Sequence, residues 1–146
     1  MFVITLVAVG AAVAAWLRPV QDRDAVAPLT PTFSSQQVFD AQSRVCAAYA
    51  KIHHAVDTNA SRTGGNDPTA QLAVAVNMRQ VYVVGSAHLF TALADEPATA
   101  TDLAAATRKI AGMFQDLALE GLASDDTAPT LAAINQTGAM IERQCK

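Results

Sequence analysis

Three histidines and two cysteines are the side chains of this 146-residue chain best suited to metal binding or nucleophilic chemistry. His53 and His54 are adjacent, and neighbouring residues of a helix point about 100° apart, so the two do not easily share one metal ion. His53 and Asp57 are four residues apart and can face one ion, but no third ligand follows at the spacing of a known motif. We therefore expect no metal site and no cofactor.

Two short stretches resemble catalytic motifs only in part. Ser86, in VVGSAH, lacks the second glycine and the strand-turn-helix setting of a nucleophile elbow. The stretch RTGGND, residues 62–67, lacks the Gly-Lys-Ser/Thr ending of a phosphate-binding loop. The acidic residues are scattered, with no pair suited to acid–base catalysis. The sequence therefore predicts a protein that is not an enzyme.

Charge and hydropathy narrow the choice of partners. The net charge is −3, and no basic run is longer than the pair Arg108 and Lys109, whereas nucleic-acid binding needs a basic patch or stripe. The mean hydropathy of +0.22 is high for a soluble domain, and the N-terminal segment contributes much of it. The sequence thus argues against a nucleic-acid partner and indicates contact with a membrane.

Residues 1–17, MFVITLVAVGAAVAAWL, contain no charged side chain and predict a transmembrane, signal-anchor helix. A helix of this length spans about 25 Å, at the short end of what crosses a hydrocarbon core of about 30 Å. Trp16 is expected at the membrane interface and Arg18 among the headgroups. A cleaved signal peptide and a helix buried in the domain are the alternatives, but no basic stretch precedes the apolar one.

Residues 18–32, RPVQDRDAVAPLTPT, carry three prolines and scattered charge, which is typical of an extended, semi-stiff linker. Arg18 and Arg23 follow the apolar segment, and by the positive-inside rule alone they place the following domain in the cytoplasm. We expect the opposite orientation, a single-pass plasma-membrane protein with residues 33–146 in the periplasm or cell envelope. The cysteine pair favours it, and so does the expectation that a basic tail precedes Met1 in the full protein.

Residues 33–146 contain four stretches with the apolar spacing of helices, separated by turn-forming residues, and predict an all-α, antiparallel four-helix bundle. The second helix, about residues 68–93, is apolar on most sides, so we expect it to be the most buried. The predicted helix starts are a capping box at Ser34 and Gln37, Asp67 before Pro68, a capping box at Thr99 and Asp102, and Pro129.

Cys46 and Cys145 lie on the first and last of these helices. Cys145 continues the inner stripe of the last helix, and Cys46 lies at the edge of the inner face of the first. The first and fourth helices of an up-down-up-down bundle are neighbours, so we expect a disulfide between the two cysteines. Two reduced, buried cysteines are the alternative. Behind a membrane segment the oxidising compartment favours the bond.

Alanine and valine occupy many inner positions, and these small side chains supply little volume to fill the core. The helices can therefore pack closely together or leave a cavity between them. Tight packing is the expected outcome, and an apolar cavity for a lipid-like ligand is the alternative. Met78, Tyr82 and Phe90 on the second helix are candidates to line such a cavity, although their spacing also suits ordinary core positions.

Several features together resemble the small alanine- and proline-rich single-pass membrane proteins of mycobacteria and related actinobacteria. They are AWLRP at the end of the apolar segment, the Pro-rich spacer, RVCAAY, NDP before the second helix, and the terminal CK. The resemblance extends over nearly the whole chain. It implies a membrane location and this architecture, but no activity.

The sequence therefore predicts a membrane-anchored, extracytoplasmic interaction or accessory protein of the cell envelope, with a membrane or envelope protein as its partner. The alternative is a binding module for a lipid or another apolar envelope ligand. The first predicts a surface that binds another protein, and the second predicts a continuous internal cavity.

Overall fold

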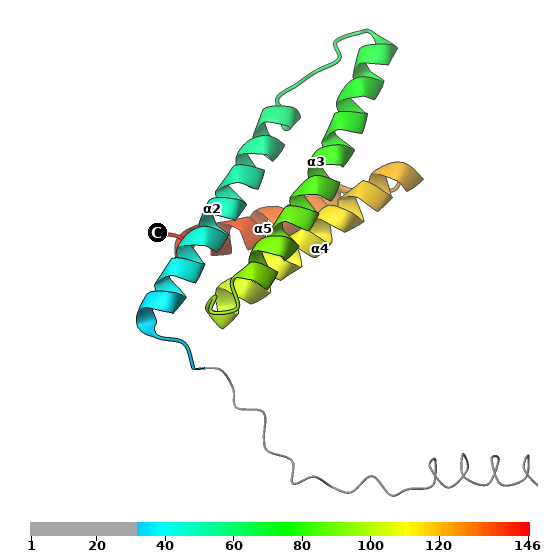
Figure 1. Ribbon diagram of the computed structural model, residues 1–146. Coiled ribbons are helices and arrows are strands. Elements are labelled where there is room, and N and C mark those ends of the chain that lie inside the picture. The colour runs from blue at the N-terminus through cyan, green and yellow to red at the C-terminus, as the bar shows by residue number, and fades with distance from the viewer. Residues whose placement is uncertain (1–31) are drawn as a thin grey trace, which may run out of the picture. The chain divides into compact units, whose positions relative to one another are not determined.

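The computed structural model describes residues 32–146, which contain four helices and no strand. These are α2 (Ser35–Ala60), α3 (Pro68–Asp95), α4 (Thr101–Ala123) and α5 (Ala128–Gln144) (Figure 1). The predicted all-α bundle is confirmed for this part of the chain. The predicted membrane segment at 1–17, with Trp16, lies outside the described residues, as do Arg18 and nearly all of the linker at 18–32. From residue 32 onward, no helix combines the length and the hydropathy needed to span a membrane.

The predicted starts of α2 and α3 are confirmed by their caps. The Ser34 hydroxyl accepts a hydrogen bond from the Gln37 backbone N–H at 3.2 Å, and the Gln37 side chain accepts one from the Ser34 N–H at 2.8 Å. At α3, the Asp67 carboxylate accepts a bond from the Thr69 N–H at 2.9 Å, and Pro68 fills a first-turn position that needs no donor. Both helices therefore begin where their side chains satisfy otherwise unpaired backbone donors.

The predicted capping box of the third helix is wrong. The N-cap of α4 is Ala100, which has no side-chain cap. The Thr99 hydroxyl instead donates to the Glu96 carbonyl at 2.7 Å, so it closes the turn that follows α3. A Thr three residues before an Asp fits a turn as well as a cap, because its hydroxyl can bond to nearby backbone groups in either setting.

The prediction that the second helix is the most buried is also wrong. The buried residues of α3 are Gly85, Ser86 and Leu89 alone, and Leu72, Val83 and Val84 are more than half exposed. The helix with the most buried positions is α4, which packs against both α3 and α5. Its buried residues are Leu103, Thr107, Ile110, Ala111, Met113, Phe114, Leu117 and Ala118.

The last helix does not lie along the first as in a regular up-down-up-down bundle. The main interhelical contacts join α3 to α4, α2 to α3, and α4 to α5. Helix α5 runs obliquely behind the α2–α3 pair and reaches α2 near its middle (Figure 1). This crossing explains how Cys145, at the end of α5, meets Cys46, which lies several turns into α2. The predicted pairing is therefore right, although the predicted alignment of the two helices is not.

Candidate functional site

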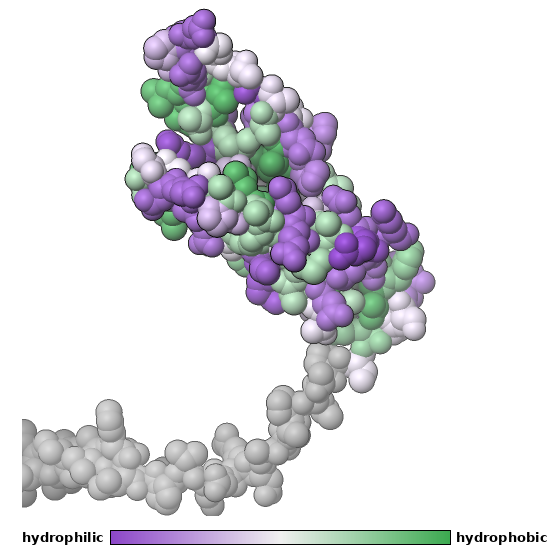
Figure 2. All heavy atoms as spheres, turned by 180° about the vertical axis from the view of Figure 1, so that it is seen from behind, coloured by the Kyte–Doolittle hydropathy of each residue, from purple (hydrophilic) through white to green (hydrophobic). Residues whose placement is uncertain are grey.

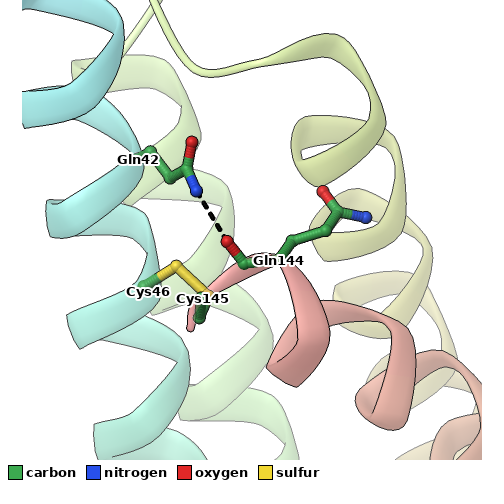
Figure 3. Close-up of a disulfide and its surroundings, with 4 residues drawn as sticks. All are labelled: Gln42, Cys46, Gln144 and Cys145. Atoms are coloured by element: carbon green, nitrogen blue, oxygen red, sulfur yellow. Dashed lines mark hydrogen bonds between the residues drawn. A yellow bond between two sulfur atoms is a disulfide. The ribbon is translucent and has the colours of Figure 1, made fainter.

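The disulfide between Cys46 and Cys145 is confirmed, with the two Cα atoms 5.6 Å apart across a sequence separation of 99 residues. Beside it, the Gln42 side-chain amide donates to the Gln144 carbonyl at 2.6 Å (Figure 3). That carbonyl belongs to the last turn of α5, where no intrahelical donor remains. The disulfide and the hydrogen bond from Gln42 together fix the end of α5 against α2.

A hollow of about 200 Å³, which we call the Tyr49 hollow, lies between α2, α4 and α5. Apolar side chains from all three helices form much of its wall, namely Val56, Ile110, Phe114 and Ile134. Polar side chains also line it, and they are Tyr49, His53, Asp57, Asn135 and Glu142. The site therefore combines an apolar wall with a polar, partly acidic group of side chains.

His53 lies between two carboxylates. Its Nδ1 is 2.9 Å from Asp57 Oδ2, one turn further along α2, and its Nε2 is 3.8 Å from Glu142 Oε1 on α5. The three side chains are about half exposed, so water screens their interactions. His53 and Asp57 thus contact each other, as their spacing of four residues allows. Among residues 32–146 no set of three His, Cys, Asp or Glu side chains is placed to hold a metal ion.

Tyr49 is the buried polar residue of this hollow, with 5% of its surface exposed. Its ring centroid is 5.7 Å from that of His53. A Cβ atom on Gly138 would lie 2.6 Å from the Tyr49 hydroxyl oxygen, so only glycine leaves room for that hydroxyl against α5. Burial, and then the charges of Glu142 and Asp57, raise the pKa of Tyr49 to about 12.

A second, wider hollow of about 410 Å³ lies next to the disulfide. It shares Tyr49, His53, Asp57 and Glu142 with the Tyr49 hollow, and Lys146 lines it as well. These four shared residues therefore face both spaces, and the two hollows lie next to each other.

The residues predicted to line an apolar cavity lie elsewhere on α3. Met78, Tyr82 and Phe90 are all half-buried. Tyr82 stacks on Phe114 with ring centroids 5.6 Å apart, and burial raises its pKa. The Tyr49 hollow, the wider hollow and a groove of about 320 Å³ between α2 and α3 are lined by other residues. Phe114 links the two regions, because it touches Tyr82 and also lines the Tyr49 hollow.

The motif fragments noted in the sequence have local structural roles. Ser86 is fully buried in the middle of α3, and its hydroxyl finds no partner among the described residues. Gly65, in the loop before α3, has a φ of 54°, a left-handed conformation that favours glycine. The Gln71 side chain donates to the carbonyl of Gly65 at 2.7 Å and holds this loop against the first turn of α3.

Sequence reasoning missed Tyr49 and Glu142 as members of the site. One signal was available, because Tyr49, His53 and Asp57 recur every four residues and so share one face of α2. Glu142 had no such signal, since its approach to His53 depends on the oblique course of α5. Comparison with protein-family models, with curated proteins and with solved structures finds no match to this chain.

Proposed function

We propose that this chain is a membrane-anchored accessory protein of the cell envelope, whose helical domain lies outside the cytosol and binds another envelope protein. The observation that carries the proposal is the apolar, exposed side of α3. Leu72 is 61% exposed, Val76 40% and Val83 54%. At 100° per residue these three positions fall within about 40° of one another around the helix. We call them the α3 stripe. Arg79 lies on the same side, and its guanidinium donates to the Gly121 carbonyl of α4 at 2.6 Å.

The α3 stripe differs from the outer face of an ordinary surface helix. A helix that is apolar on all sides is normally buried, because its outer side chains gain from removal from water. Apolar surface is visible from behind at the end of the domain that carries the α2–α3 loop (Figure 2). A partner of matching chemistry would present an apolar, uncharged surface, such as one side of an amphipathic helix.

The compartment in the proposal rests on the disulfide. Disulfides persist in oxidising compartments and are rare in the cytosol, so a bond that closes most of the domain supports a location outside it. The apolar segment at residues 1–17 supplies the proposed anchor, in the orientation opposite to that given by Arg18 and Arg23 alone.

Binding of a lipid is the less supported alternative. Pockets for drug-sized ligands usually measure about 300–1,000 Å³. The Tyr49 hollow, which is walled by three helices, measures about 200 Å³, and the larger spaces of about 410 and 320 Å³ are more open to solvent. A long acyl chain does not fit the Tyr49 hollow and stays partly exposed to water in the two open spaces, so the exposed α3 stripe supports protein binding better.

Site-specific photocrosslinking in intact cells tests the proposal. A photoreactive amino acid placed at Val76 or Val83 is expected to give a discrete crosslinked product with one other envelope protein. The matched control places the same amino acid at Arg108, which is exposed on α4. A product at twice the mass of the chain would indicate self-association and contradict an accessory role. Equal products from Val83 and Arg108 would contradict a specific interface.

A further inference from the structure

We propose that the Tyr49 hollow binds a small molecule with an apolar body and a protonated amine. The apolar body would lie against Val56, Ile110 and Phe114. The amine would lie near Asp57 and Glu142, at the polar side whose residues also line the wider hollow. This site is separate from the α3 stripe and does not depend on the proposed protein partner.

The size of the hollow selects a compact ligand. An apolar cavity of about 150 Å³ is enough to hold benzene in another protein. The Tyr49 hollow, at about 200 Å³, has room for a six-membered ring with a short substituent. Its apolar wall removes such a ring from water, which is the main source of affinity for an apolar group.

The charge of the polar side selects a cation. Carboxylates carry a negative charge at neutral pH, so a positive charge on the ligand is attracted by both of these side chains. His53 contacts one oxygen of each carboxylate, which leaves Asp57 Oδ1 and Glu142 Oε2 outside that contact. Of the basic side chains nearby, His53 lines the Tyr49 hollow, and His54 and Lys146 line the wider hollow only.

Tyr49 supplies the observation that is independent of the carboxylates. Its side chain is more than nine-tenths buried, lines both hollows, and makes no hydrogen bond to another residue of the described part of the chain. The buried side-chain atoms that lack a partner in the described residues belong to Ser86, Thr107 and Glu120, so the Tyr49 hydroxyl oxygen keeps some exposed surface and can accept a hydrogen bond. A ligand N–H can donate to the Tyr49 oxygen, and the electron-rich ring face also attracts a cation.

Titration of the full chain in maltoside micelles with three ring compounds tests the charge preference. The probes are benzylamine, benzyl alcohol and benzoate, which share a ring and differ in charge. Methyl NMR signals of Ile110 and Ile134 report binding in the hollow. Benzylamine is expected to shift both signals with a Kd about tenfold lower than that of benzyl alcohol, and benzoate is expected to shift neither. Equal affinity for benzylamine and benzyl alcohol, or no shift at all, would overturn the proposal.

Single substitutions then assign the contacts. Asp57→Asn and Glu142→Gln should each raise the Kd for benzylamine about two- to fivefold and leave that for benzyl alcohol unchanged, since both carboxylates are partly screened by water. Tyr49→Phe keeps the ring and should weaken benzylamine more than benzyl alcohol. The matched control is Asp116→Asn, an exposed carboxylate on α4 outside the hollow. If Asp116→Asn weakens benzylamine as much as Glu142→Gln does, the effect is long-range and the assignment is wrong.

Discussion

Replacement of Cys46 and Cys145 together by serine is expected to lower the free energy of unfolding by about 4–5 kcal/mol. The bond closes a loop with a sequence separation of 99 residues, and a loop of that length gives the unfolded chain much more freedom once it is opened. Domains of this size are usually stable by about 5–15 kcal/mol, so the loss removes a large share of the total. Denaturant unfolding of the full chain in maltoside, followed by circular dichroism, measures the change.

The end of α5 is the part of the domain that we expect to loosen first when the disulfide is lost. Helix α5 is the shortest of the four described helices, and its main packing contacts are with α4. Its far end is fixed to α2 by the disulfide and by the bond from Gln42 to Gln144. Wild-type protein in reductant is the control, because it keeps both cysteines and should match the double variant. A change below about 1 kcal/mol in both samples would contradict a structural role for the bond.

Leu103→Ala is expected to destabilise the domain by about 2–5 kcal/mol, because the substitution removes buried methyl groups and leaves a cavity. Leu103 is fully buried in the first turn of α4 and belongs to the main core cluster. The helix propensities of Leu and Ala are similar, so the loss reports packing rather than helix formation. Thermal unfolding by circular dichroism and denaturant titration both measure it.

Leu122→Ala is the matched control for this prediction. Leu122 lies in the last turns of the same helix and is 68% exposed. The same chemical change there should shift the free energy of unfolding by no more than about 0.5 kcal/mol. Equal losses for the two variants would mean that the ends of α4 are buried alike, in contradiction to this packing.

The features that could be predicted from sequence are those set by local chemistry. Ser34 with Gln37, and Asp67 with Pro68, mark helix starts because short-range hydrogen bonds and the missing proline donor act within a few residues. The pairing of Cys46 with Cys145 followed from the inner register of two helices. The predicted disulfide required only that the first and last helices meet near the two cysteines. They do meet there, although α5 crosses α2 obliquely instead of running along it.

The features that could not be predicted depend on which helices are neighbours. The apolar pattern of α3 gave no sign that Leu72 and Val83 remain exposed, because composition alone does not say what covers a helix. Helix α4 is more buried than α3 because it packs against both α3 and α5. The same packing places Ile110 and Phe114 at the Tyr49 hollow. The contact between His53 and Glu142 likewise follows from the course of α5.

Thiol labelling of intact cells that express the full chain tests the central claim most directly, that the disulfide closes a helical domain outside the cytosol. A membrane-impermeant maleimide is expected to label neither cysteine until an impermeant reductant is added, and then to label both. A reporter cysteine at Phe39, which is 67% exposed, in the Cys46→Ser, Cys145→Ser background should react without reductant and gives the topology separately. Labelling of Cys46 and Cys145 only after the cells are lysed, or without any reductant, would contradict the account.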